Sequence, residues 1–280
     1  MNTVLVADIG GTTTRIAYAT PQIKEVFVYK TNKKIIQTLL AYAKEKKVAK
    51  IAIAAAGIHI SDTIALSNNN VKISKKLLEK ETNAQVYLYN DIEAIGFAVK
   101  HTLKAKILRK GIKNPHKAII SIGTGLGKAV IHENNIYPSE ISKTPFPCYT
   151  KKDLDLIKNI KHPTYETILS GKGLELLHKK IHPKHIHRST KEMKQHQTRY
   201  TKQAYKLFAQ YLARVVKQTI LDDITTGGIY LAGGALTKEI IQRFIKEMND
   251  KNTIIKNTSL WIYEDQYIAL RGLAHEICRK

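Results

Sequence analysis

An acid, two glycines and a run of hydroxyls lie close together near the start of the chain. The segment VLVADIGGTTTRIAYAT occupies residues 4–20, and Asp8 stands two residues before Gly10 and Gly11. Consecutive N–H groups in a glycine turn form a concavity that binds anions, and glycine lets a ligand approach the backbone closely. A carboxylate beside such a turn can hold a hydrated Mg²⁺ ion that masks phosphate charge. The segment therefore predicts a phosphate site, with further donors at Thr12, Thr13 and Arg15.

Two later segments repeat this arrangement of an apolar strand followed by glycines. Residues 118–131, AIISIGTGLGKAVI, carry a turn spaced G-T-G-L-G, and residues 229–236, IYLAGGAL, end a strand on a glycine pair. The first of these is not a P-loop, because no G-K-[ST] follows and the next element is a strand. One such segment alone also fits an ordinary β-hairpin, whereas two suggest related half-domains that face one nucleotide. The residues expected to contact that nucleotide here are Gly123, Thr124, Gly125, Gly127, Gly233 and Gly234.

The elements around the first turn alternate between strands and helices. The apolar alternation over residues 4–20 fits a hairpin better than a helix. We expect further strands at 25–30, 50–57, 63–66 and 86–90, and helices at 34–47, 74–81 and 92–101. This alternation favours a mixed or parallel sheet covered by helices.

A basic, turn-rich stretch divides the chain. KAKILRKGIKNPHK, residues 104–117, is predicted to link the first α/β region to a second one over residues 117–264. In the second region we expect long helices near 191–223 and 237–248. Side chains at helical spacing inside the first of these are predicted to be core: Tyr205, Phe208, Tyr211 and Leu212.

The three glycine motifs occur in an order that resembles the sugar kinase/actin-like ATPase superfamily and, within it, the bacterial-type glucokinases. The resemblance continues in register along nearly the whole chain, through LSNNNVKIS (66–74), YNDIEAIGFAV (89–99), SIGTGLG (121–127), PSEISKTPF (138–146), YETILSGKGL (165–174) and IYLAGGAL (229–236). Thr13 stands where those enzymes usually have Asn. The resemblance implies ATP and Mg²⁺ as cofactors, with Asp8 holding the metal through water.

The same resemblance implies the α/β two-domain actin-like ATPase (ribonuclease H-like) fold, with a cleft between the domains. A small α/β domain would comprise residues 1–103, completed by a C-terminal helix within 266–280. A large α/β domain would comprise residues 104–265. The chain would then pass between the domains twice, which suits hinge closure.

Asp91 is the candidate for the catalytic base. It follows the strand expected at 86–90 and begins the helix expected at 92–101, where a carboxylate acting as N-cap is held in one orientation. Taken alone this residue could serve capping only, and the resemblance favours catalysis. The carboxylate would accept the proton of a sugar hydroxyl as the γ-phosphoryl group of ATP arrives, a role worth on the order of 10²–10⁴ in rate.

The resemblance also implies which side chains contact the sugar. Carboxylates and amides suit this task, because each can serve two neighbouring hydroxyls. The implied residues are Asn68, Asn90, Asp91, Glu140 and Glu166, with Lys143 beside them. Taken alone, Asn68 could be a turn residue and Glu166 a solvated helix end.

One motif departs from the glucokinase pattern. Those enzymes have E-G-G-H where residues 140–143 of this chain are E-I-S-K, so Lys143 replaces a sugar-contacting His. A neutral imidazole can accept a hydrogen bond, whereas an ammonium only donates and carries charge. The expected substrate is glucose by default, with another hexose, an amino sugar or a related polyol as the alternatives. Lys143 could instead point into solvent.

The composition is that of an ordinary globular protein. Of the 280 residues 43% are hydrophobic and 25% are charged, and no apolar run approaches the ~18 residues that a membrane span needs. Cys148 and Cys278 are too few for a disulfide framework, and the strand expected from Thr3 leaves no room for a signal peptide. We therefore expect a reduced, cytoplasmic protein with no membrane partner. The sequence leaves the oligomeric state open, a homodimer included.

The basic charge fits a different class of function. Lys and Arg number 46 against 23 Asp and Glu, a net charge of +23, which would suit a nucleic-acid-binding protein. The lysines are scattered through every segment, and Lys, Ile and Asn are abundant together, which favours the composition of an AT-rich genome as the cause. We expect ATP and a sugar as partners and no nucleic acid. A non-catalytic sugar or nucleotide sensor on the same fold is the further alternative, which the presence of both Asp8 and Asp91 disfavours.

Overall fold

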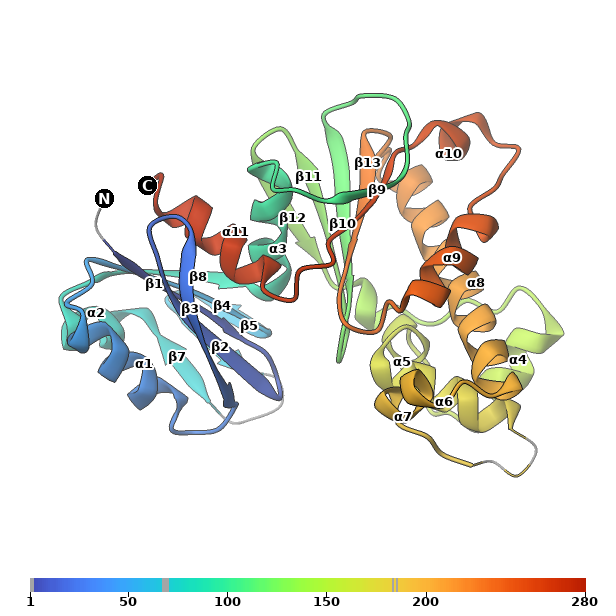
Figure 1. The fold of residues 1–280 in the computed structure, drawn as a ribbon, viewed down its shortest axis with the longest axis horizontal. Coiled ribbons are helices and arrows are strands. Elements are labelled where there is room, and N and C mark those ends of the chain that lie inside the picture. The colour runs from blue at the N-terminus through green and yellow to red at the C-terminus, as the bar shows by residue number, and fades with distance from the viewer. Residues whose placement is uncertain (1–2, 67–70, 183, 185) are drawn as a thin grey trace. The chain divides into compact units, whose positions relative to one another are not determined.

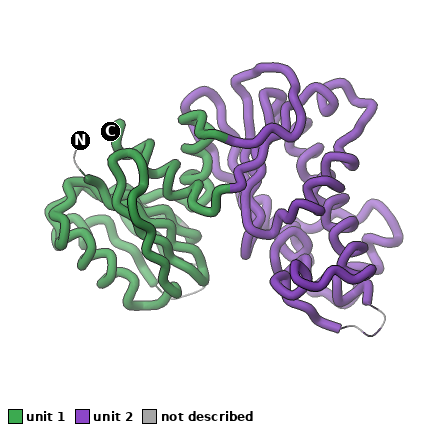
Figure 2. The backbone as a smooth tube through the Cα atoms, in the orientation of Figure 1, with its two compact units in different colours: residues 1–104, 265–280 green, residues 105–264 purple. Residues whose placement is uncertain are grey.

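The chain forms two compact units. The computed structural model describes residues 3–66, 71–182, 184 and 186–280. One unit comprises Met1–Lys104 and Asp265–Lys280, and the other Ala105–Glu264 (Figure 2). In each unit helices pack on a mixed β-sheet (Figure 1), which confirms the predicted α/β class. No helix in the described ranges is both long and apolar enough to cross a bilayer.

The sheet of the first unit has the strand order β3-β2-β1-β4-β8. Its strands are β1 (Val4–Ile9), β2 (Thr13–Ala19), β3 (Ile23–Lys30), β4 (Lys50–Ala55) and β8 (Gln85–Asn90). β1 is antiparallel to β2 and parallel to β4, which is parallel to β8. The two central strands β1 and β4 are almost wholly buried, as expected of apolar strands covered on both faces. The carboxyl ends of the three parallel strands meet at one edge.

Helices cover both faces of this sheet. The remaining elements of the unit are α1 (Ile35–Glu45), α2 (Lys75–Thr82), α3 (Asp91–Lys100), α11 (Ile268–Ile277) and a small sheet of β5 (Gly57–Ile60), β6 (Thr63–Leu66) and β7 (Lys72–Ser74). Leu39 of α1 and Leu78 of α2 share a core with Leu5 of β1. α3 and α11 pack against each other and against β4. A Cβ at Gly272 would lie 2.0 Å from the Ala94 carbonyl oxygen, so α11 approaches the α3 backbone very closely.

The second unit repeats the strand order of the first. Its sheet is β12-β11-β10-β13-β14-β9, formed by β9 (Lys106–Arg109), β10 (His116–Ile122), β11 (Leu126–His132), β12 (Asn135–Ser139), β13 (Gly228–Ala232) and β14 (Leu260–Ile262). β10, β11 and β12 form an antiparallel meander, and β13 and β14 extend it in parallel. β1, β2, β3, β4 and β8 are arranged in the same way, so the units are related half-domains, as the two glycine turns suggested.

Helices supply most of the core of the second unit. They are α4 (Lys151–Ile157), α5 (Tyr165–Ile168), α6 (Gly171–Ile181), α7 (Thr190–Gln195), α8 (Arg199–Asp222), α9 (Lys238–Glu247), α10 (Thr253–Asn257) and a 3₁₀ turn at Ile141–Lys143. The four side chains of α8 predicted to be core are at most 1% exposed, namely Tyr205, Phe208, Tyr211 and Leu212.

Three predicted elements differ from the structure. The expected linker at 104–117 contains β9, which pairs with β14 at the edge of the second sheet. Arg109 fastens this strand, since its guanidinium donates to the carbonyl oxygens of Met248 and Ile255. The expected helix at 191–223 is interrupted at 196–198, where Thr198 caps α8. The strand expected at 50–57 ends at Ala55, and a separate strand begins at Gly57.

Candidate active site

The first glycine turn joins β1 to β2. The Gly10 N–H donates to the Thr13 carbonyl oxygen at 3.0 Å and closes the turn. Thr31 braces it, since its hydroxyl donates to the Gly10 carbonyl at 2.8 Å and its N–H donates to the Thr12 carbonyl at 3.0 Å. The Gly11 and Thr13 residues are half-buried and Thr12 is exposed. The turn is therefore held by backbone bonds while Thr12 is accessible to a ligand.

Asp8 and Arg15 lie directly opposite each other on the β1–β2 ladder. Arg15 Nη1 donates to Asp8 Oδ2 at 3.2 Å, and the Asp8 side chain is 15% exposed. Burial raises the pKa of Asp8, and the neighbouring guanidinium acts in the opposite direction. The described residues contain no cluster of three or more His, Cys, Asp or Glu that could enclose a metal. A cation at Asp8 would thus draw its other ligands from water and phosphate.

The structure corrects one detail of the predicted base. The N-cap of α3 is Asn90, whose Oδ1 accepts the Ile92 N–H at 3.0 Å, while Glu93 accepts the Asn90 N–H at 2.7 Å. Asp91 is the first residue of the helix, because the extended backbone of β8 continues to Asn90, which has φ −69° and ψ 151°. Asp91 Oδ1 also accepts the Ile92 N–H at 3.0 Å. At this helix end the dipole stabilises an ionised carboxylate.

The parallel strands bring these two groups to the same edge of one sheet. In the register, Ile9 lies opposite Ala55, and Ala55 lies opposite Asn90. Because neighbouring strands are ~4.8 Å apart, about 10 Å separates the backbone of Ile9, directly before the first glycine turn, from that of Asn90. The Ala56 N–H donates to the Ile9 carbonyl oxygen at 3.2 Å and ties the turn to β4. A glycine turn and a candidate base therefore share one scaffold.

The second glycine turn joins β10 to β11 and lies at the start of α6. The Gly123 N–H donates to the Gly125 carbonyl oxygen at 2.9 Å, and the Gly171 N–H donates to the Gly123 carbonyl oxygen at 2.9 Å. Ser170 caps α6 by accepting the Gly173 N–H at 3.0 Å. The N-terminus of an 11-residue helix thus adjoins the turn, and its dipole adds positive potential there.

The two glycines after β13 serve different purposes. Gly233 has φ +113°, and a Cβ there would lie 2.2 Å from the Ile122 carbonyl oxygen, so the fold requires glycine at this position. At Gly234 and at Gly123 a Cβ would meet no atom of the described protein within 4 Å. The fold itself does not need glycine at these two positions. The open space beside them leaves room for a ligand to approach bare backbone.

Glu166 reaches the second turn from α5. Its Oε2 accepts the Leu126 N–H at 3.1 Å, and its Oε1 lies 3.2 Å from Lys143 Nζ. A Cβ at Gly125 would lie 2.5 Å from Glu166 Oε2, so this glycine makes room for the carboxylate. One side chain therefore connects the glycine turn to the segment that departs from the glucokinase pattern.

The segment around Glu140 is a 3₁₀ turn. The Lys143 N–H donates to the Glu140 carbonyl oxygen at 3.0 Å, and the Glu140 carboxylate accepts the Ser142 hydroxyl at 3.3 Å. Glu140 is exposed, whereas Ser142 is buried. Of the residues predicted at the second turn, Thr124 is exposed, and Gly127 lies within β11 opposite Ser121. Gly127 is thus a strand residue.

Two residues near the turns were not predicted from the sequence. Thr31 braces the first turn, and Lys194 Nζ donates to the Gly234 carbonyl oxygen at 2.9 Å. Neither belongs to a motif, and Lys194 is one of many dispersed lysines. Asn68, predicted to contact the sugar, lies outside the described residues. The other predicted residues fall into two sets, with Asp8–Arg15, Asn90 and Asp91 in the first unit and the rest in the second.

Two similar proteins are described as a glucokinase-like protein and a glucokinase. A glucokinase-like protein of Xylella fastidiosa is 27% identical over 270 residues, which cover 83% of this chain and 79% of that protein. A glucokinase of Neisseria meningitidis is 26% identical over 265 residues, covering 84% of this chain and 80% of the relative.

Solved structures share the fold. A glucokinase from an Antarctic psychrotroph superposes with a TM-score of 0.80 at 19% identity, covering 100% of both chains. The glucokinase of Balamuthia mandrillaris in complex with glucose gives a TM-score of 0.77 at 17% identity, covering 100% of this chain and 94% of the other. These likenesses confirm the actin-like sugar kinase fold. The model of the family described as Glucokinase matches residues 5–279, and the chain is thus a sugar kinase that belongs to the glucokinase family.

Proposed function

We propose that this sugar kinase transfers the γ-phosphoryl group of ATP to the 6-hydroxyl of glucose, with Asp91 as the catalytic base. The observation that carries the proposal is the common edge at which β1 and β8 end, where the Asp8 turn and Asp91 lie on one scaffold. A kinase needs phosphate donors and a base in fixed relation, because positioning supplies much of its rate. A sensor would not need the base.

Asp91, Arg15, the first turn and Asp8 each have a separate role in the proposed reaction. Asp91, at the N-terminus of α3, takes the proton of the sugar hydroxyl, and the oxygen attacks the γ-phosphorus as ADP leaves. Arg15 and the backbone donors of the first turn stabilise charge on the phosphates. Mg²⁺, when bound, masks phosphate charge, and Asp8 would hold it through water. Its partly buried carboxylate, with Arg15 at one oxygen, suits such an outer contact.

The second unit supplies the proposed nucleotide backbone site and further sugar contacts. The open space at Gly123 and Gly234 supports close approach of ATP to bare backbone. In line with the resemblance, we assign the sugar to Asn68, Asn90, Asp91, Glu140, Lys143 and Glu166. Both cysteines are free, in keeping with a cytoplasmic site of action.

A different sugar is the second candidate substrate, and the Lys143–Glu166 ion pair is the observation that favours it. Glu166 already has a partner at each oxygen, Leu126 N–H at one and Lys143 at the other. A glucose hydroxyl that used Glu166 as acceptor would compete with the ammonium. A screen over hexoses and amino sugars identifies the substrate and donor, with coupled ADP release read for ATP as donor and sugar-phosphate formation read for polyphosphate as donor.

Asp91→Asn tests the proposal directly. The amide keeps the shape of the side chain but cannot take a proton, so turnover should fall by at least ~10²-fold while sugar and ATP still bind. Rates and calorimetric binding are measured on the same preparation. Glu93→Gln, which alters the neighbouring capping box, serves as the control for damage to the start of α3. Turnover near the wild-type value in Asp91→Asn would remove this residue from the role of base.

A further inference from the structure

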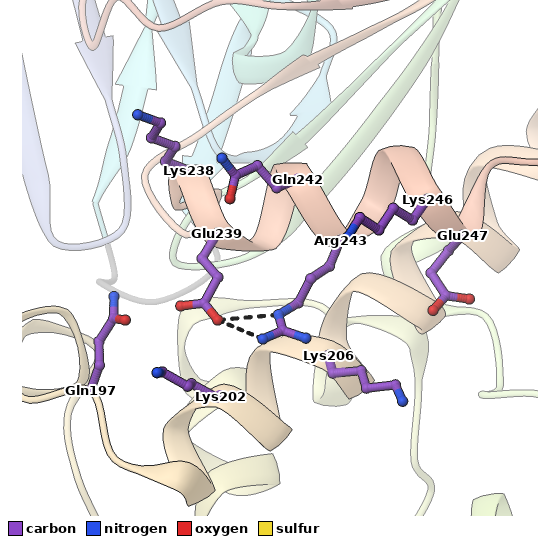
Figure 3. Close-up of a pocket in the computed structure, with 9 residues that line it drawn as sticks. All are labelled: Gln197, Lys202, Lys206, Lys238, Glu239, Gln242, Arg243, Lys246 and Glu247. Atoms are coloured by element: carbon purple, nitrogen blue, oxygen red, sulfur yellow. Dashed lines mark hydrogen bonds and ion pairs between the residues drawn. The ribbon is translucent and has the colours of Figure 1, made fainter.

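A groove of about 660 Å³ lies between α8 and α9 in the second unit, and one of its lining residues, Lys238, stands four residues after Gly234. Figure 3 shows Lys202 and Lys206 extending from α8 and the Glu239–Arg243 pair lying between the two helices. The side chains that line it are all charged or amide: Gln197, Lys202, Lys206, Lys238, Glu239, Gln242, Arg243, Lys246 and Glu247. Five cations thus face two carboxylates.

The carboxylates do not neutralise the lysines. Glu239 accepts two bonds from Arg243, at 2.7 and 3.2 Å, and Glu247 accepts Gln210 Nε2 at 3.3 Å. Within the described chain, Lys202, Lys206, Lys238 and Lys246 have no carboxylate within ion-pair distance. At the other end of α8, Lys217 pairs with Asp250 at 2.7 Å, so the same helix does neutralise a lysine there. The groove therefore keeps four lysine charges that no carboxylate of the described chain neutralises.

The start of α8 adds to this potential. Lys202 lies in the first turn of α8, which contains no acidic residue, whereas the first turn of α9, which begins at Lys238, holds Glu239. A helix N-terminus carries partial positive charge, so a cation placed there is unfavourable unless an anion is nearby. An anionic ligand would satisfy both the lysines and the N-terminus of α8.

The spacing and type of the side chains that line the groove favour one kind of anion. Lys238 and Lys246 are eight residues apart on α9, about 12 Å along the axis, which exceeds the reach of a single phosphate and suits an extended chain. The lining has no aromatic or aliphatic residue on which a nucleobase could stack. Ammonium groups bind phosphate oxygens as point charges without needing a fixed geometry. We propose that the α8–α9 groove is a binding site for inorganic polyphosphate.

The test compares two variants of equal charge. One carries Lys202→Gln, Lys206→Gln, Lys238→Gln and Lys246→Gln; the control carries Lys110→Gln, Lys113→Gln, Lys151→Gln and Lys152→Gln, which alter exposed lysines of the same unit. Binding of a short inorganic polyphosphate is measured by calorimetry at fixed ionic strength, because salt screens such contacts. The groove variant should bind at least about tenfold more weakly than wild type, and the control within about twofold of it.

Three outcomes overturn the proposal. Equal weakening in both variants would mean that diffuse charge holds the polyphosphate, and no binding to wild type would mean that the groove has no such ligand. Tighter groove-dependent binding of single-stranded RNA than of polyphosphate would make it a nucleic-acid site. Circular dichroism checks the fold of each variant. The readout is binding, so the result is independent of whether glucose is the substrate.

Discussion

The β1–β2 turn and the β10–β11 turn each join two antiparallel strands but acquire their carboxylates differently. At the first turn, Asp8 and Arg15 lie seven residues apart and face each other across one hairpin. At the second, Glu166 comes from α5, 40 residues from the Leu126 N–H that it accepts. The carboxylate at the first turn comes from the same hairpin, whereas the carboxylate at the second turn is brought there by the tertiary fold. Two related half-domains can therefore diverge in chemistry while keeping one topology.

The two carboxylates differ in how far a substitution at each one extends beyond its own turn. Asp8 is positioned by strand pairing, and its side chain pairs with Arg15 of the same hairpin. Glu166 contacts both the second turn and Lys143, so a substitution in the turn or at Lys143 alters the other contact of Glu166 as well. We expect the first turn to control phosphoryl transfer and the second to couple nucleotide and sugar binding.

Asp8→Ala should have the largest effect. Because the carboxylate is proposed to serve the metal and not the sugar, kcat should fall by at least ~10²-fold while sugar affinity is retained. Steady-state kinetics over a range of Mg²⁺ concentrations and sugar titration by calorimetry measure the two effects. Loss of sugar binding with ATP hydrolysis intact would reverse the roles assigned to the two turns.

Gly125→Ala should have an intermediate effect. The new methyl would lie 2.5 Å from Glu166 Oε2, so the carboxylate must move and give up the Leu126 N–H. Hydrogen bonds to charged groups contribute ~1.5–3 kcal/mol, so the KM for the sugar should rise about tenfold or more. The flexible end of Glu166 can yield, so thermal melting should show a folded protein.

Gly123→Ala is the matched control for that variant. A Cβ at this position meets no described protein atom within 4 Å, so neither the fold nor Glu166 is disturbed. The KM for ATP should rise, because the methyl occupies space proposed for the nucleotide, and the KM for the sugar should not. If Gly125→Ala and Gly123→Ala change the same parameter, the two positions do not have separate tasks.

Lys143→Ala should have the smallest effect. Its side chain is 68% exposed and that of Glu166 is 34% exposed, and exposed ion pairs contribute ~0.2–1 kcal/mol. Freeing Glu166 Oε1 for a sugar hydroxyl should lower the KM for glucose by up to about fivefold. Replacing residues 141–143 with Gly-Gly-His should raise kcat/KM for glucose further. An unchanged KM in Lys143→Ala would place this lysine outside the sugar site.

The parts predicted correctly from the sequence are those governed by neighbours in the chain. The alternation around Asp8 predicted the hairpin, and the spacing of Tyr205 and Phe208 predicted a buried helix face. The capping of α3 by Asn90 was missed, because Asn and Asp have similar capping preference and the end of β8 decides between them. The basic composition of 104–117 concealed β9, whose partner strand β14 lies more than 150 residues further along the chain. The Glu166–Leu126 bond has no local signal either.

The docking of α11 on α3 and on β1 has a consequence for how the protein is made. Unit 2 is one continuous stretch, Ala105–Glu264, whereas unit 1 needs Asp265–Lys280 to complete the face formed by β1 and β4. On the ribosome, unit 2 therefore has all its residues before unit 1 does. Until α11 emerges, one apolar face of the first sheet has no cover from this helix, and such nascent faces are where chaperones bind and where aggregation begins. β1 and β4 are thus synthesised before unit 2 but receive the cover of α11 only after it.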